Sequence, residues 1–148
     1  MFNWLMPIIG GVRCLDLFAG SGVLGLEALS RGAAEVCFVE RSTAAARQIE
    51  ATLLEFDCLD AQVCNVDATK FLSRTPQMFD LVLVDPPFGT MDLGNLCTLL
   101  AQGWLAPGAR IYLELSRRDA LPDLPPDWTL EHEKTAGQVR FALARFTG

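Results

Sequence analysis

Short apolar runs alternate along the chain with longer segments in which apolar residues recur every three or four positions. The apolar runs span residues 13–18, 35–40, 61–65, 79–85 and 110–115. The helical periodicity is found at 23–30, 43–56 and 92–102, and Ile49, Leu53 and Phe56 share one face of the second of these segments. Alternation of short buried strands with helices predicts an α/β protein with a mostly parallel, doubly wound sheet.

The last part of the chain has a different pattern. Segments 128–135 and 138–146, joined through Ala136-Gly137, predict an antiparallel hairpin, so the whole sheet is expected to have seven strands. With 148 residues, the chain matches the size of one compact domain, and its hydrophobic fraction of 51% suits a sheet that is covered on both faces. We found no apolar run of membrane-spanning length and no signal peptide, which predicts a cytoplasmic protein without a membrane partner.

A glycine turn follows the first predicted strand, in the sequence LDLFAGSG at 15–22. Gly20 and Gly22 permit close backbone approach, and the following helix offers free N–H groups. Together with Gly25 they stand at the glycine positions of a dinucleotide-binding turn, which leaves that class of ligand open on this turn alone. Asp16 argues against it, because a carboxylate here repels an anion and favours a cationic ligand such as S-adenosylmethionine.

Acidic residues also follow the second and third predicted strands. Glu40 lies about twenty residues beyond the glycine turn, at the interval where an acid meets a ribose diol; the alternative is that it caps the helix that starts near Ser42. Asp67, with the N–H of Ala68, is expected to bind an adenine amino group, or else to cap the segment 68–73.

The sequence Asp85-Pro86-Pro87-Phe88 ends the fourth predicted strand. Two prolines make this tetrapeptide a stiff arch that presents Asp85 and nearby carbonyls outward. These acceptors can hold the hydrogens of a planar exocyclic amine while the ring of Phe88 stacks on the attached group. Beside the glycine turn, the arch indicates methyl transfer to an amine; on its own it is equally typical of a strand-ending turn.

These motifs carry a resemblance to a known family that runs along nearly the whole chain. The matching segments are Phe2-Asn3-Trp4-Leu5, 14–22, 24–31, Val84-Asp85-Pro86-Pro87-Phe88, Gly103-Trp104-Leu105 and 133–139. The chain resembles the bacterial 16S ribosomal RNA guanine-N2 methyltransferases of the RsmD type. The long helix signature and the Ala-Gly-Gln-Val turn narrow the resemblance to this family, whereas the glycine turn and the arch mark amino methyltransferases in general.

The resemblance implies a Rossmann-like class I methyltransferase fold and a monomer that transfers methyl from S-adenosylmethionine, without a metal, to a guanine N2 of 16S rRNA or the small ribosomal subunit. S-adenosylhomocysteine is the implied product. The predicted catalytic residues are Asp85, Pro86, Pro87 and Phe88. The predicted cofactor-binding residues are Asp16, Phe18, Ala19, Gly20, Ser21, Gly22, Glu40, Arg41, Asp67, Ala68 and Asp85.

Family members carry a basic segment ahead of the stretch that matches Phe2-Asn3-Trp4-Leu5. We therefore expect residues 1–148 to form a single methyltransferase domain without that segment, and whether this chain is active alone is an open question. A net charge of −6 is unfavourable for binding phosphates. Arg117-Arg118, Lys134 and Arg140 form either a local basic patch or part of a solvated face.

Two alternatives stay open at this point. The same arch serves methyltransferases that act on adenine N6 in DNA or on protein glutamine, and a cofactor-binding ribosome-assembly module without activity would carry the same motifs. Other chemistry finds less support: His132 lies between two glutamates in a predicted strand, and Ser21 lacks the flanking pattern of a hydrolase nucleophile. Five cysteines without C-x-x-C spacing indicate reduced thiols rather than a zinc site.

Overall fold

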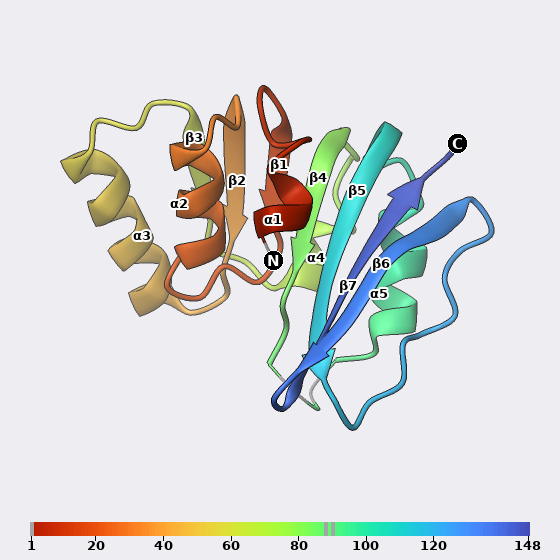
Figure 1. The fold of residues 1–148 in the computed structure, drawn as a ribbon. Helices are drawn as coiled ribbons and strands as arrows, with labels where there is room; N and C mark the ends of the chain where they lie inside the picture. Colours follow the sequence, from red (N-terminus) through yellow and green to blue (C-terminus); the bar gives the residue numbers. More distant parts are fainter. Residues whose placement is uncertain (1, 88, 90) are drawn as a thin grey trace.

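The computed structural model describes residues 2–87, 89 and 91–148, which form a seven-stranded sheet with helices on both faces (Figure 1). The strands are β1 (Arg13–Asp16), β2 (Glu35–Val39), β3 (Ala61–Cys64), β4 (Phe79–Val84), β5 (Leu105–Ser116), β6 (Trp128–Ala136) and β7 (Val139–Phe146). The helices are α1 (Phe2–Leu5), α2 (Val23–Ser30), α3 (Thr43–Glu55), α4 (Ala68–Phe71) and α5 (Leu93–Leu100). The predicted α/β class is confirmed.

The strands lie in the order β3-β2-β1-β4-β5-β7-β6. Strands β1 to β5 pair in parallel, whereas β7 is antiparallel to both β5 and β6, so the predicted C-terminal hairpin is also confirmed. The carboxyl ends of the parallel strands lie at the lower edge in Figure 1, together with the β6–β7 turn. The order of strands reverses between β1 and β4, which is where ligands bind in sheets of this kind.

The two faces of the sheet bury different residues of the same strands. In β4, Leu81 and Leu83 pack with α1, α2 and α3, while Val82 and Val84 pack with α4 and α5. All four side chains are fully buried. The continuous apolar runs of the sequence therefore have their physical cause in a sheet that is covered on both faces (Figure 1).

Two parts of the fold differ from the prediction. Strand β5 begins at Leu105, not at Arg110, because Leu105 pairs with Phe79 before a register shift that brings Arg110 beside Leu81. Pro107-Gly108 therefore lies inside an irregular strand and does not precede it. The sequence also did not predict α1, which packs Leu5 against the face of the sheet that carries α2 and α3.

Among the described residues, every helix is too short or too polar to cross a lipid bilayer.

Trp104 anchors the far side of the core. Its side chain is 1% exposed, and its ring centroid lies 5.0 Å from that of Phe71 in α4 and 6.4 Å from that of Phe79 in β4. One indole thus joins a helix to the sheet at the end remote from the glycine turn.

Replacing Trp104 with Ala is expected to lower the free energy of unfolding by about 3–5 kcal/mol, because the cavity left between Phe71 and Phe79 cannot collapse fully. Urea denaturation measures this change. Leu59→Ala is the control: that side chain is 92% exposed, and its loss should stay within about 0.5 kcal/mol. Equal losses in the two variants would contradict the assignment of Trp104 to the core.

Candidate functional site

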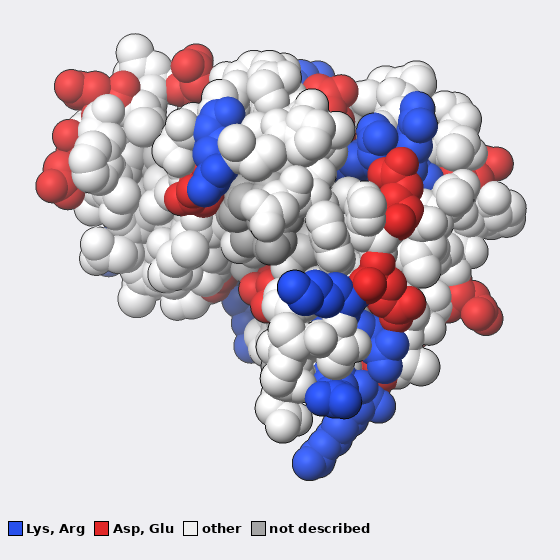
Figure 2. Space-filling view, viewed as in Figure 1, with Lys and Arg blue, Asp and Glu red and all other residues white. Residues whose placement is uncertain are grey.

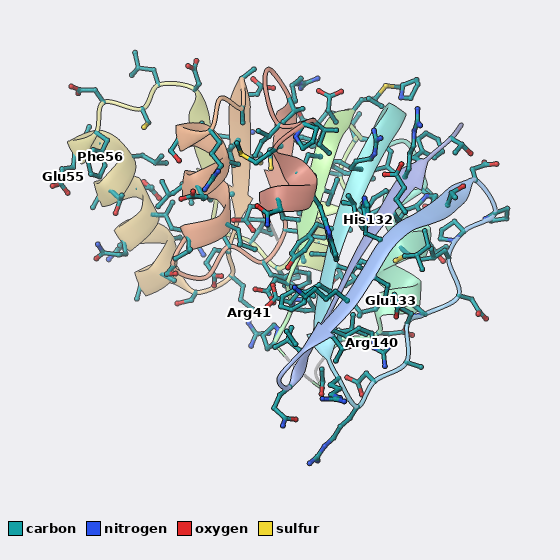
Figure 3. The ribbon with its side chains drawn as sticks, in the orientation of Figure 1. Arg41, Glu55, Phe56, His132, Glu133 and Arg140 are labelled. Carbon is teal, nitrogen blue, oxygen red and sulfur yellow. The ribbon has the colours of Figure 1, made fainter. Side chains whose placement is uncertain are left out.

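A cavity of about 670 Å³ opens at the carboxyl ends of the parallel strands. Its walls come from the segments that follow β1, β2, β3 and β4. The lining residues are Leu17, Phe18, Ala19, Gly20, Ser21, Val23, Leu24, Val39, Glu40, Arg41, Val66, Asp67, Ala68, Asp85, Pro86, Pro87 and Met91. The structure therefore brings together the four separate motifs of the sequence, and Arg41, labelled in Figure 3, lies at this edge as well. Asp16 and Gly22, which were also predicted as site residues, lie outside this lining.

The glycine turn forms one wall of the cavity. Gly20 and Gly22 have φ angles of 57° and 86°, values that a residue with a side chain adopts only under strain. The N–H of Ala19 donates to the carbonyl of Val39 at 2.9 Å, and that of Gly22 donates to the carbonyl of Ala19 at 2.8 Å. These bonds fix the turn against the end of β2 and direct the amino end of α2 toward the cavity.

Glu40 joins two turns at the rim of the cavity. Its Oε1 accepts a hydrogen bond from the N–H of Gly20 at 2.8 Å, and its Oε2 accepts one from the N–H of Ser42 at 2.7 Å. The proposed capping role is wrong, since the N-cap of α3 is Ser42, whose hydroxyl accepts from the N–H of Ala45 at 3.3 Å. Each carboxylate oxygen keeps acceptor capacity for a further donor from the cavity.

Asp16 is buried behind the glycine turn, with 1% of its surface exposed. Its Oδ2 accepts a hydrogen bond from the N–H of Gly25 at 3.1 Å. A Cβ at Gly25 would stand 2.3 Å from Cε1 of Phe38, so the helix can approach the strand this closely only because residue 25 is glycine. Burial raises the pKa of Asp16 to about 7, and the nearby carboxylates of Asp85 and Glu40 add to this, although the Gly25 hydrogen bond opposes it.

Asp67 caps α4, since its Oδ1 accepts from the N–H of Thr69 at 3.2 Å and from the Thr69 hydroxyl at 3.0 Å. The capping alternative is therefore observed. Asp67 and Ala68 also line the cavity, so contact with an adenine stays a prediction that is compatible with the cap.

The arch that follows β4 lies across the cavity from Glu40. Asp85 is half-buried, Pro86 is buried and Pro87 is exposed, whereas the predicted stacking residue Phe88 lies outside the described residues. Burial raises the pKa of Asp85 to about 6, and the carboxylate of Glu114 contributes to the same shift. A carboxylate with this pKa is ionised at neutral pH and can still accept a proton.

The comparisons with known proteins decide the family. The family model described as "Conserved hypothetical protein 95" matches residues 1–145. Ribosomal RNA small subunit methyltransferase D of Escherichia coli is 44% identical over 144 residues, which cover 97% of this chain and 73% of the relative. The chain belongs to the family of ribosomal RNA small subunit methyltransferase D.

Other relatives agree. Ribosomal RNA small subunit methyltransferase D of Haemophilus influenzae is 42% identical over 148 residues, covering 97% of this chain and 76% of the relative. A solved structure described as a putative methyltransferase yhhF from E. coli superposes with a TM-score of 0.95 at 42% identity, covering 99% of this chain and 82% of that one. The class I methyltransferase fold is confirmed, and with it a methyltransferase in place of the dinucleotide-binding protein that the glycine turn alone left open.

Several features of the site were not predicted. Glu114 stands within the apolar run of β5 and accepts a hydrogen bond from the hydroxyl of Tyr112 at 3.0 Å. A carboxylate inside an otherwise apolar run is the signal that could have identified Glu114. His132 is exposed as predicted, but its ring stacks on that of Trp4 with centroids 5.1 Å apart, which links the hairpin to α1.

Basic residues gather at the β6–β7 turn, next to the site. Figure 2 shows Lys and Arg atoms at the lower end of the molecule, where Figure 1 places this turn. The N–H of Arg117 donates to the carbonyl of Gln138 at 2.8 Å, and a guanidinium nitrogen of Arg140 lies 2.8 Å from Glu133, both of which Figure 3 labels. Within the described residues, no group of three or more His, Cys, Asp or Glu side chains could hold a metal ion.

Replacing Asp16 with Asn should stabilise the protein increasingly as the pH rises. Between its unfolded pKa and about 7, folded Asp16 holds a proton that the unfolded chain has released, so the wild type loses stability across this window. Asn cannot ionise, and the advantage of Asp16→Asn should grow by up to roughly 3 kcal/mol between about pH 5 and pH 8. Urea denaturation at both pH values measures it.

Asp123→Asn, a change at an exposed acid, is the control and should show no such trend. An advantage of Asp16→Asn that does not vary with pH would contradict the raised pKa.

Proposed function

We propose that this chain transfers the methyl group of S-adenosylmethionine to the exocyclic N2 of a guanine in small-subunit ribosomal RNA. The observation that carries the proposal is the convergence of the glycine turn and the Asp85-Pro86-Pro87 arch at one cavity, with Asp16 buried behind the turn. The relatives named above as ribosomal RNA methyltransferases point to the substrate class. The choice of guanine as the target base, and of N2 as its methylated atom, rests on the family resemblance of the sequence.

The cavity fits this cofactor in size and charge. Its volume of about 670 Å³ lies within the range of small-molecule sites. Three carboxylates line it, those of Glu40, Asp67 and Asp85, against the guanidinium of Arg41, which suits a ligand that carries a sulfonium and an ammonium group. When bound, S-adenosylmethionine supplies a methyl group that is already electrophilic.

Each wall of the cavity has a proposed part in binding. The glycine turn contacts the amino-acid end, although the N–H groups of Ala19, Gly20 and Gly22 already donate inside the protein. The charge of Asp16 behind the turn favours the ammonium group of the ligand. Glu40 accepts from the ribose hydroxyls with the capacity left on its two oxygens, while Asp67 and the N–H of Ala68 contact the adenine. The remaining proposed contacts are Phe18, Ala19, Gly20, Ser21, Gly22 and Arg41.

The arch acts on the target amine. The lone pair of a guanine amine is delocalised into the ring, so the site has to orient it and favour its tetrahedral form. Asp85 and the carbonyl of Pro86 accept hydrogen bonds from the two N2 hydrogens. As the bond from N2 to the methyl carbon forms and the carbon–sulfur bond breaks, Asp85 takes the proton released from N2. Correct positioning of the reactants accounts for up to about 7–11 kcal/mol of the barrier.

The target base has to leave its stack to reach this cavity, which is the usual way in which proteins recognise RNA bases. On the family resemblance, we propose that the protein acts as a cytoplasmic monomer on 16S rRNA or on the small subunit, with Phe88 and Pro87 flanking the base.

The test is transfer of radiolabelled methyl from S-adenosylmethionine to unmethylated small-subunit particles, followed by nucleoside analysis. It is run with this chain and with a longer form that carries the basic amino-terminal segment expected from the resemblance. Label in N2-methylguanosine with either form supports the proposal. Label in N6-methyladenosine, or label from neither form, would overturn it, and cofactor binding without any transfer would favour an inactive binding module.

Asp85→Ala is expected to reduce turnover by at least about 10³-fold and to lower cofactor affinity far less, because it removes the acceptor for the N2 hydrogens but spares the glycine turn and the other two carboxylates of the lining. Labelled transfer and equilibrium binding measure the two effects. Asp123→Ala, at an exposed position, is the matched control. Turnover that survives in Asp85→Ala would remove Asp85 from the mechanism.

The rate at saturating cofactor should depend on pH through Asp85. Because its pKa is raised to about 6, the carboxylate becomes protonated below that value, and kcat should fall about tenfold per pH unit there. A pH profile of single-turnover transfer measures this limb. A rate that stays constant down to about pH 4.5 would show that an ionised Asp85 is not required.

A further inference from the structure

A row of four side chains crosses the sheet beside the arch. Val84, the last residue of β4, pairs with Leu113 of β5, so Asp85 directly after β4 comes beside Glu114, whose carboxylate acts on it electrostatically. Glu114 pairs with Phe141 of β7, and Phe141 pairs with Lys134 of β6. Because residues opposite one another in a sheet place their side chains on the same face, Asp85, Glu114, Phe141 and Lys134 form one cross-strand row.

The neighbouring row on this face is occupied by the core. Leu83 pairs with Tyr112, Tyr112 with Leu143, and Leu143 with His132. The first three of these side chains are buried in the cluster that includes α1, and His132 is stacked on Trp4. In the cross-strand row, by contrast, Glu114 and Phe141 are only half-buried and Lys134 is exposed. The cross-strand row is therefore the first part of this sheet face that is accessible to a ligand at the carboxyl ends of the parallel strands.

Glu114 is held in place from the core side. The Tyr112 hydroxyl donates to its Oε2 at 3.0 Å, and the Tyr112 side chain is fully buried. Burial and the adjacent carboxylate raise the pKa of Tyr112, so the hydroxyl stays a donor at neutral pH. Among the described residues, Glu114 accepts no further hydrogen bond, which leaves Oε1 as an oriented acceptor beside Asp85.

Two adjacent carboxylates present acceptors alone, and this selects among planar amines. The Watson–Crick edge of guanine presents the N1–H donor directly beside the N2 amine, so both groups can donate to such a pair. Adenine presents the N1 lone pair beside its N6 amine, and glutamine presents a carbonyl oxygen beside its amide nitrogen. With adenine or glutamine, an acceptor of the substrate would therefore face an acceptor of the site. Two acceptors cannot form a hydrogen bond with each other, and the unpaired polar groups strongly disfavour binding of these substrates.

We infer that Glu114 determines specificity for guanine by accepting the N1–H of the target base while Asp85 accepts from its N2 amine. Tyr112 is a positioning residue that orients the Glu114 carboxylate. The half-buried ring of Phe141 provides an apolar surface beside the base, and Lys134 at the end of the row suits an RNA phosphate. This inference rests on the proposed function and adds to it the reason why guanine, and not adenine, is the substrate.

The test compares two RNAs once the methylated guanine has been located in the wild-type product. One carries guanine at that position, and the other carries 2-aminopurine, which keeps the 2-amino group but has a lone pair at N1. The quantity measured is the ratio of kcat/KM for guanine to that for 2-aminopurine. Glu114→Gln should lower this ratio at least about tenfold, because the glutamine amide can donate to the 2-aminopurine N1.

Two further variants separate specificity from general damage. Tyr112→Phe removes the hydroxyl that orients Glu114 and should lower the ratio by less, about threefold. Glu133→Gln makes the same chemical change on β6, opposite Ala142 of the other core cluster, and should leave the ratio as it is. A structural role for Glu114 would reduce both kcat/KM values together and leave their ratio constant.

The outcomes are distinct. A lowered ratio in Glu114→Gln and in Tyr112→Phe supports the inference. A ratio that equals the wild-type value in both variants overturns it while the proposed function stands. If the wild type methylates no guanine at all, the proposed function fails and the inference fails with it.

Discussion

The candidate site depends on one hydrogen bond between the central strand and the first helix that follows it. The Oδ2 of Asp16, at the end of β1, accepts from the N–H of Gly25 in α2 at 3.1 Å, and no larger residue than glycine fits there beside Phe38. This contact joins the two ends of the segment between β1 and α2, and that segment contains the glycine turn that lines the cavity. The same carboxylate is costly to ionise, and a cationic ligand in the cavity would offset that cost.

The register of the strands determines how the site residues are placed relative to the bond between Asp16 and Gly25. Asp16 pairs with Phe38 of β2 and with Leu83 of β4, so all three strands end at nearly the same level of the sheet and the segments that follow them begin there. That level brings Glu40 within 2.8 Å of the Gly20 N–H and sets the arch across the cavity. Since side chains alternate between faces, a slip of one residue in β4 would turn Asp85 away from Glu114 and into the opposite core. The apolar residues of β4, buried on both faces, are what prevent that slip.

Much of this was predictable from local patterns, and the exceptions share a cause. The order of the elements follows from hydrophobic periodicity, and the placement of Asp16, Glu40 and Asp85 at one edge follows from their positions at strand ends. The start of β5 at Leu105 was not predictable, because pairing with Phe79 overrides the turn propensity of Pro107-Gly108. In each such case the deciding partner is distant in the sequence.

The same limit applies to chemistry. Local spacing suggested that Glu40 serves either a ligand or the cap of α3, whereas the structure shows its two oxygens bridging Gly20 and Ser42. Nothing near Glu114 in the sequence marks it as a neighbour of Asp85, because that proximity depends on the register between β4 and β5. Residues whose role is set by a turn can be identified from sequence, and those whose role is set by pairing between strands need the structure.

The net charge of the whole chain is a poor guide to whether the protein binds RNA. The net charge of −6 suggests weak attraction to phosphates, but charges more than about 10 Å apart are largely screened in physiological salt. The structure partly separates the two signs: Glu40, Asp67 and Asp85 line the cavity with Arg41, while Arg117 is hydrogen-bonded to Gln138 beside the β6–β7 turn. Figure 2 shows Lys and Arg atoms at that end of the molecule. On the proposed function, this separation excludes the phosphate backbone from the catalytic carboxylates and attracts it to the hairpin. A base that leaves its stack can then enter the acidic cavity alone, and the donors on its edge decide whether it is accepted.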